Sequence, residues 1–290
     1  MKVSVIVNGS KRKAIAAGRS FSELGKAEGL DVKLLVTNFR GHGAELAQAV
    51  SESCDAMIAV GGDGTINECV NGMMKSAHQP ALGLLPYGTA NDFCRSTDFD
   101  RDIHKLIKKI KSGQTRPCDV GRLKYADFNE YFVNIADAGF GARVVRRIED
   151  YPTWLTSGAK FNLGILRTFL TYQNKEMKVV GDGFEWSDKS VMVVVANAKY
   201  FASGLHVAPQ AELNSGKFVV LCIGDVGMKD YIAQFPKLKR GEILTHPQMH
   251  YFETSWVEIS GQGFVEKDGE LGGEVPVRAE NLPSAIQLID

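Results

Sequence analysis

The first 118 residues alternate short apolar runs with longer segments in which apolar residues recur at helical spacing. Short apolar runs bounded by glycine and polar residues are typical of buried strands. We therefore predict strands over Val3–Asn8, Val32–Thr37, Ala56–Val60 and Ala81–Leu85, and helices over Ala14–Glu28, Ala44–Ser53 and Asp102–Ser112. Strands that alternate with helices favour a parallel sheet with helices on both faces, so residues 1–118 are expected to form an α/β domain.

After Gly113 the pattern changes to short apolar runs separated by turn-rich stretches. These runs predict strands at Cys118–Leu123, Tyr131–Ala136, Val179–Val180, Val191–Ala196, Phe218–Ile223 and Val257–Ser260. Residues 119–290 are therefore expected to form a mainly β, sandwich-like second domain. A strongly apolar segment near residues 156–172, flanked by Trp154 and containing Phe161, predicts a helical insertion. Any of its apolar residues that are exposed could contact lipid.

The most informative local pattern follows the predicted strand Ala56–Val60. The strand runs into a turn made of Gly61, Gly62, Asp63, Gly64 and Thr65, after which helical spacing begins at Ile66. Glycines allow a ligand to approach the backbone, and the N-terminus of the following helix presents N–H groups, so the turn is suited to phosphate. Asp63 would repel phosphate unless a bridging Mg²⁺ lay between them. The alternative is an ordinary Asp-Gly turn.

A second loop has similar chemistry. The run Ala81–Leu85 is followed by Pro86-Tyr87-Gly88-Thr89-Ala90-Asn91-Asp92-Phe93. In α/β folds ligands bind at the carboxyl ends of the strands. Asn8 and Thr37 also follow strand ends, so one crevice could collect all of these groups.

Together these motifs resemble the catalytic domain of the diacylglycerol kinase family. The resemblance rests on Gly61–Thr65 with Asn67 and Glu68, and on Gly88–Phe93, and it extends along the full chain. The family comprises lipid kinases, including sphingosine and ceramide kinases and bacterial homologues. The resemblance implies an active site in the inter-domain cleft, with ATP as phosphate donor and Mg²⁺ held by Asp63. The residues that it implies at the nucleotide are Asn8, Ser10, Thr37, Gly61, Gly62, Asp63, Gly64, Thr65, Asn67, Glu68, Gly88, Thr89, Asn91 and Asp92.

A third motif would supply the proton acceptor that an alcohol kinase needs. Asp268-Gly269-Glu270 matches the family's Asp-Gly-Glu, whose carboxylate takes up the proton of the acceptor hydroxyl. On its own the tripeptide is typical of a hairpin turn. We expect Asp268 to be the base and keep Glu270 as the competitor. The alternative for Glu68 is structural: its negative charge would be favoured by the dipole at the start of the helix in which it lies.

Two departures from the family pattern stand out. By resemblance, bacterial members have two carboxylates at the positions occupied here by Ser215 and Val219, and the first of them helps to hold a second, structural Mg²⁺. A hard divalent cation requires anionic oxygen, so we expect that second metal site to be lost or weak. The first loop reads Asn8-Gly9-Ser10-Lys11-Arg12 where the family has Asn-Pro-x-Ser-Gly, so Lys11 and Arg12 could meet phosphate directly or be exposed.

Composition narrows the class of partner. Lysine plus arginine equals aspartate plus glutamate, at 34 each in 290 residues, so no basic bias points to nucleic acid. The apolar run at Val3–Val7 is too short for a signal peptide, and no window is apolar over the length of a membrane span. We expect a cytoplasmic protein that contacts a membrane surface transiently. The sequence does not fix the oligomeric state, and a homodimer is possible.

The leading hypothesis is an ATP-dependent lipid kinase that transfers the γ-phosphate to a lipid hydroxyl, with diacylglycerol as the default acceptor. NAD kinase is the alternative enzyme, because by resemblance it shares the Gly-Gly-Asp-Gly-Thr turn and the Asn-Glu pair. A second alternative is a nucleotide-binding regulatory protein without turnover, since function resides in sites rather than in folds.

Overall fold

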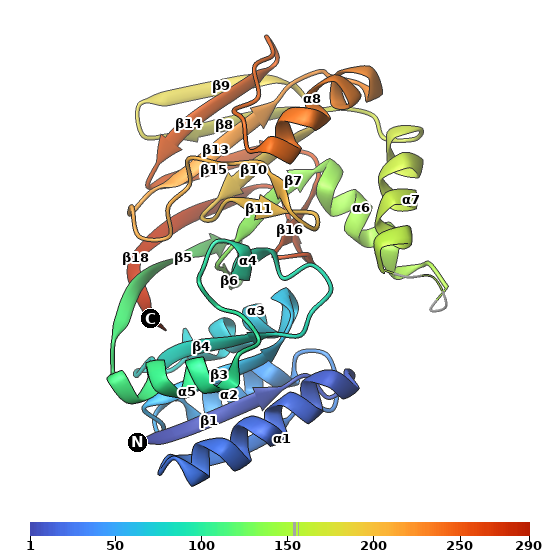
Figure 1. Ribbon diagram of the computed structural model, residues 1–290. Coiled ribbons are helices and arrows are strands. Elements are labelled where there is room, and N and C mark those ends of the chain that lie inside the picture. The colour runs from blue at the N-terminus through green and yellow to red at the C-terminus, as the bar shows by residue number, and fades with distance from the viewer. Residues whose placement is uncertain (153–154, 156) are drawn as a thin grey trace. The chain divides into compact units, whose positions relative to one another are not determined.

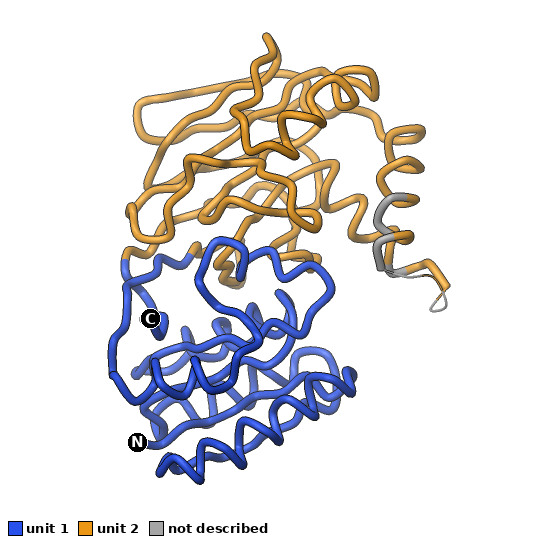
Figure 2. The backbone as a smooth tube through the Cα atoms, in the orientation of Figure 1, with its two compact units in different colours: residues 1–120, 284–290 blue, residues 121–283 orange. Residues whose placement is uncertain are grey.

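The computed structural model describes residues 1–152, 155 and 157–290. Its backbone divides into two compact units: unit 1 comprises Met1–Val120 and Ser284–Asp290, and unit 2 comprises Gly121–Pro283 (Figure 2). Strand β5 (Thr115–Lys124) leads from unit 1 into unit 2, and strand β18 (Val277–Ile289) leads back. The C-terminal segment therefore returns to the unit in which the chain began.

Unit 1 contains a parallel sheet in the order β2-β1-β3-β4 (Figure 1). Its strands are β1 (Lys2–Val7), β2 (Asp31–Val36), β3 (Ala56–Gly61) and β4 (Ala81–Pro86). Near its end, β18 joins the sheet beside β4, where Leu288 pairs with Leu82. Every residue of β3 is buried, as expected for a strand whose two faces are both covered.

Helices cover both faces of this sheet. They are α1 (Arg12–Ala27), α2 (His42–Ser51), α3 (Asp63–Met73), α4 (Asp92–Arg95) and α5 (Ile103–Ser112). Helices α1 and α5 share one hydrophobic core with Val5 and Ile58. Helices α2 and α3 pack so closely against each other that a Cβ on Gly72 would lie 2.3 Å from the carbonyl oxygen of Ala44. The predicted α/β domain with a parallel sheet is confirmed.

Unit 2 is built mainly from two antiparallel sheets. The first contains β18, β15 (Trp256–Gly261), β8 (Lys175–Gly181) and β9 (Phe184–Ser190); β5 also pairs with β18, and β6 (Asn129–Phe132) pairs with β5. The second has the order β14 (Met249–Thr254), β13 (Phe218–Ile223), β10 (Met192–Ala196), β7 (Ile135–Gly139), β16 (Phe264–Lys267) and β17 (Glu270–Glu274). A small ribbon is formed by β11 (Tyr200–Phe201) and β12 (Leu205–His206).

The second sheet is buried on both faces. Val193 and Val195 of β10 share one core with Val179 and Val257 of the first sheet. The alternate residues of β10, including Val194, contribute to another core together with side chains of three helices. These helices are α6 (Phe140–Glu149), α7 (Ser157–Phe169) and α8 (Met228–Arg240). The sandwich-like prediction is thus confirmed.

The predicted helical insertion corresponds to α7. Trp154 and Thr156, which belong to that prediction, lie outside the described residues, as does the side chain of Phe161. None of the helices in the described part of the chain is long and apolar enough to cross a membrane.

One predicted strand is wrong. Tyr131–Ala136 is not continuous but is divided into β6 and β7 by a turn at Val133 and Asn134. The N–H groups of this turn bond to the carboxylate of Asp268, more than 130 residues away in the sequence. Apolar periodicity along one segment does not report such a distant acceptor.

Candidate active site

The turn between β3 and α3 has the geometry expected of a phosphate loop. Helix α3 begins at Asp63, directly after the strand, and has no side-chain cap at its N-terminus. Its first backbone hydrogen bond runs from Ile66 N to Gly62 O, so the helix leaves the N–H groups before Ile66 without helical acceptors. These N–H groups and the positive end of the helix dipole suit an anion.

The glycines of this turn are required by close contacts. A Cβ on Gly61 would lie 2.3 Å from Thr65 Oγ1, and a Cβ on Gly62 would lie 2.7 Å from the Cα of Gly88. Real Cβ atoms do not approach other heavy atoms so closely, so the backbones of the two glycine loops touch directly. The structure therefore brings together the two loops that were predicted from separate strand ends.

Asp63 connects the same two loops. Its Oδ1 accepts a hydrogen bond of 3.0 Å from Phe93 N, at the start of α4. Among the described residues no donor to Oδ2 is found, so this oxygen is available to a cation. Mg²⁺ is commonly held by one or two carboxylates together with water and substrate phosphates, so a single carboxylate beside a phosphate loop fits it.

Asn91 shapes the second loop. It adopts a left-handed backbone with φ of 51°, a conformation that asparagine tolerates better than most residues. Its side chain accepts a bond from Gly88 N and donates one to Gly88 O, at 2.8 and 3.1 Å. Asp92 is buried and forms an ion pair with Arg95 at 3.4 Å, whereas Thr89 is exposed.

The first loop is attached to the phosphate turn by Asn8. Asn8 Nδ2 donates to Thr65 Oγ1 at 3.1 Å, and Asn8 Oδ1 accepts bonds from both N and Oγ of Ser10. Thr37, after β2, accepts a bond from Gly9 N. The predicted residues at the ends of β1, β2 and β3 are thus linked by hydrogen bonds, and those at the ends of β3 and β4 by the contacts just described.

Two predicted nucleotide residues lie in α3 beyond the turn. Asn67 is buried, and Asn71 Nδ2 donates to its oxygens. The carboxylate of Glu68 accepts bonds from Gly41 N and Gly43 N, at 2.7 and 2.9 Å. Glu68 therefore caps the N-terminus of α2, which supports the fold; its predicted contact with the nucleotide stays a prediction.

In unit 2, Asp268 and Gly269 form the two-residue turn of the β16–β17 hairpin, with φ of 50° and 84°. The Asp268 carboxylate accepts bonds of 3.0–3.1 Å from Val133 N, Asn134 N and Ile135 N. Asp268 is only 7% exposed. A buried carboxylate that accepts three backbone N–H bonds is an anchor for the β6–β7 turn, which argues against the role of base that we expected for it.

Glu270 begins the other strand of this hairpin and is partly exposed. It is therefore the carboxylate of the Asp-Gly-Glu motif that is better placed to meet a substrate.

Three buried carboxyl groups were not predicted from the sequence: Asp119, Asp137 and Glu266. Asp119 accepts a bond from Ser284 N at 2.8 Å and so holds the returning C-terminal segment within unit 1. A signal for one of them was present, because Asp137 interrupts the otherwise apolar strand β7. Burial of a charged side chain is costly and therefore marks a specific role.

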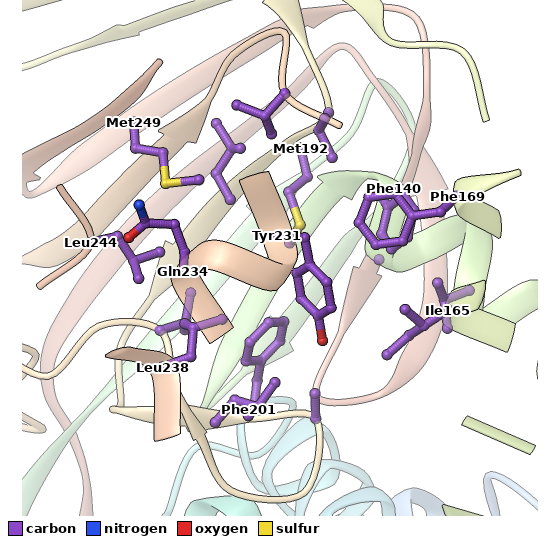
Figure 3. A pocket seen from close by; sticks show the side chains of 18 residues that line it. Phe140, Ile165, Phe169, Met192, Phe201, Tyr231, Gln234, Leu238, Leu244 and Met249 are labelled. Atoms are coloured by element: carbon purple, nitrogen blue, oxygen red, sulfur yellow. The ribbon is translucent and has the colours of Figure 1, made fainter. Parts of the chain in front are cut away.

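Unit 2 also contains an apolar cavity of about 100 Å³ between the second sheet and its helices. Phe140, Ile165, Phe169, Met192 and Leu238 are among the side chains around it, and Figure 3 shows them directed toward a common space. The polar side chains in the wall are those of Tyr231 and Gln234. Such a lining favours an apolar ligand.

The two positions that depart from the family pattern have structural roles. Val219 is buried in the core of the second sheet, and the Ser215 hydroxyl bonds to backbone groups of its own turn. Across residues 1–152, 155 and 157–290 there is no group of three or more His, Cys, Asp or Glu side chains placed to hold a metal ion.

Comparisons with known proteins agree with this arrangement. Residues 2–123 match the diacylglycerol kinase catalytic domain, and residues 134–290 match the YegS C-terminal NAD kinase beta sandwich-like domain. A diacylglycerol kinase from Bacillus subtilis is 30% identical over 252 residues, covering 83% of this chain and 80% of its own. One from Staphylococcus saprophyticus is 29% identical over 259 residues, covering 84% and 79%.

Solved structures show the same fold. A crystal structure of a diacylglycerol kinase from Bacillus anthracis is 21% identical, superimposes with a TM-score of 0.74, and covers 99% of this chain and 96% of its own. The family matches together extend over both units, and the sequence relatives align across most of the chain. The chain therefore belongs to the diacylglycerol kinase catalytic-domain family.

Proposed function

We propose that this protein is an ATP-dependent lipid kinase that transfers the γ-phosphate of ATP to the hydroxyl group of a lipid, with diacylglycerol as the default acceptor. The observation that carries the proposal is the phosphate turn at the start of α3, which Asp63 joins to the second glycine loop through Phe93 N. The apolar lining of the cavity in unit 2 favours an apolar acceptor and offers little to a dinucleotide. The family relationship supports the same enzyme class.

The phosphate donor is assigned to unit 1. The N–H groups at the start of α3 and the hydroxyl of Thr65 would contact the phosphates, with Asn8 and Asn91 shaping the loops on either side. Asp63 Oδ2 would hold Mg²⁺. When bound, the metal would neutralise the charge that develops on the transferred phosphoryl group.

We assign the proton acceptor to Glu270. Asp268 is engaged by three backbone N–H groups, whereas Glu270 is partly exposed on the next strand of the same hairpin. A carboxylate in this role orients the lipid hydroxyl and accepts its proton as the phosphoryl group transfers.

Peripheral contact with a membrane stays a prediction. We assign it to Leu163, Leu166 and Leu170, which are 44%, 51% and 77% exposed on or directly after α7. Ile165 and Phe169, on the same helix, line the apolar cavity, so α7 would connect a bilayer surface with the acceptor site.

The test is transfer of label from γ-labelled ATP with Mg²⁺ to lipids in mixed micelles, with NAD as a soluble control. Label in diacylglycerol or another lipid hydroxyl would support the proposal and identify the acceptor. Label in NADP would reassign the protein to NAD kinase. ATP binding without label in any acceptor would favour the regulatory alternative.

Glu270→Gln is expected to lower kcat by roughly 10²-fold or more, the usual contribution of a general base. ATP affinity and the free energy of unfolding should change little, because the amide has the same shape and the residue is partly exposed. Isothermal titration with a non-hydrolysable ATP analogue and urea unfolding measure these controls. Full activity of Glu270→Gln would exclude it as the base.

A further inference from the structure

Two acidic side chains lie directly opposite each other inside unit 2. Glu266 of β16 pairs with Asp137 of β7 in the antiparallel register. They are 6% and 1% exposed. Neighbouring Val265 and Ala138 belong to the core between the sheets, so alternation places both carboxyl groups on the other face of the strands, toward the helices. Cβ atoms of residues directly opposite are roughly 5 Å apart, close enough for the carboxyl groups to meet.

The hydrogen bonds around the pair are unequal. Asp137 Oδ1 accepts a bond of 3.2 Å from Ala142 N in the first turn of α6, where the helix dipole favours negative charge. Asp137 Oδ2 is completely buried and receives no N–H or O–H bond from an ordinary donor in the described residues. Glu266 Oε2 accepts a bond of 2.8 Å from Gly269 N, in the turn of the Asp-Gly-Glu hairpin.

Among the described residues, neither Asp137 nor Glu266 forms an ion pair with a lysine, arginine or histidine. The charged or titratable groups that interact with the pair include the Asp268 carboxyl, with Glu266, and the Tyr172 hydroxyl, with Asp137; Tyr172 also interacts electrostatically with Arg143. Lys267 follows Glu266 on β16, and its amine instead pairs with Glu130 at 3.1 Å. Two buried carboxylates without a counter-ion would be strongly unfavourable. Burial and the charge of Asp137 accordingly raise the pKa of Glu266 well above its ordinary value.

A single proton shared by the two carboxyl groups would remove one of the two buried charges and give Asp137 Oδ2 a hydrogen-bond donor. Carried on Glu266 Oε1, it would bond to the otherwise unpartnered Asp137 Oδ2, and Glu266 Oε2 would remain the acceptor for Gly269 N. Burial raises the pKa of Asp137 to about 6, so at neutral pH it would stay ionised against the N-terminus of α6.

We propose that Asp137 and Glu266 share one proton, held on Glu266, and that this proton fixes the hairpin on which Glu270 lies. Glu266 is thus a positioning residue, since it acts through the Gly269 N–H and not on the substrate. The consequence for catalysis rests on the proposed lipid kinase function, whereas the shared proton does not.

The sign of the pH dependence follows from proton binding. The unfolded chain loses this proton near the ordinary glutamate pKa of 4.5, whereas the folded chain retains it to higher pH. Folding stability contributed by the pair is therefore complete below that value and is lost as the pH rises toward the folded pKa. In this interval the equilibrium constant for unfolding should increase by up to about tenfold per pH unit.

Urea unfolding of the full chain between pH 5 and 9 tests the shared proton. Glu266→Gln reproduces the protonated side chain, because its amide can donate to Asp137 and accept from Gly269. The increase of the unfolding equilibrium constant with pH that is expected in the wild type should therefore disappear in this variant. Glu253→Gln, an exposed change of the same kind on β14, should behave as wild type. An infrared C=O band of a protonated carboxyl group should be present in the wild type at neutral pH and absent in Glu266→Gln.

Other results would overturn the proposal. If the free energy of unfolding of Glu266→Gln depended on pH in the same way as that of the wild type, or if the infrared band were unchanged, Glu266 would not hold the proton. If Glu266→Gln does not fold, Asp137→Asn provides the second test, because removing one charge should also flatten the pH dependence.

A kinase pH profile completes the test. The kcat/KM of the wild type should decline as the pair loses its proton, and Glu266→Gln should lack that decline; identical profiles would refute the positioning role. If no lipid is phosphorylated at all, the proposed function fails, while the unfolding and infrared results still decide whether the proton is shared.

Discussion

Replacement of Asp63 by Asn is expected to lower kcat/KM for phosphotransfer by roughly 10³-fold, the scale on which a preorganised charge at a transferring phosphoryl group acts. Asn retains an oxygen that can accept the 3.0 Å bond from Phe93 N, so the two glycine loops should remain joined. What is lost is the negative charge that would bind Mg²⁺. Steady-state kinetics over a range of Mg²⁺ concentrations should show a higher metal requirement as well as slower turnover.

The matched control is Asp31→Asn, an exposed change of the same charge at the start of β2. It should leave both kinetics and stability unaltered. Comparable thermal unfolding of the Asp63→Asn variant would show that the loss is chemical. If instead Asp63→Asn retained wild-type kinetics and metal dependence, Asp63 would not be the metal ligand, and another carboxylate would have to be found.

Most of unit 1 could be predicted because its strands and turns are determined by residues that are close together in the sequence. A strand such as Ala56–Gly61 is buried on both faces, so it reads as an uninterrupted apolar run wherever it occurs. The glycine turn after it is equally local, since Gly61 is required by contact with Thr65 only four residues later. The convergence of Asn8 and Thr65 follows from parallel strand order, because the ends of adjacent parallel strands meet at one edge.

What could not be predicted depends on distant partners. Glu68 caps α2 from α3, so its role is set by the packing of two helices and not by its own helix. The proposal of Glu270 over Asp268 rests on N–H groups of the turn between β6 and β7, which is far from Asp268 in the sequence. Strand β18 crosses from one unit to the other, a path that no composition change marks. Helix α8 was not predicted; it contains Pro236, a residue type that normally breaks the interior of a helix.

Replacement of Asp268 by Ala is expected to destabilise the protein by at least about 3 kcal/mol, because three backbone N–H groups lose their acceptor and each unsatisfied buried group costs about 1–3 kcal/mol. This is a large share of the roughly 5–15 kcal/mol that stabilises a typical domain. Urea unfolding measures the loss, and hydrogen exchange should show faster exchange at Val133, Asn134 and Ile135. These amides should remain protected in Glu270→Gln.

Asp268→Asn separates anchoring from proton transfer. Asn tolerates the left-handed backbone at this position, and its oxygen could still accept from Asn134 N and Ile135 N, but its amide nitrogen would face Val133 N. The expected order of stability is wild type, then Asn, then Ala, with activity falling in step with folding. If Asp268 were the base, the outcome would differ: Asp268→Asn would fold as stably as the wild type but would lose turnover. That result would return the role of base to Asp268 and remove it from Glu270.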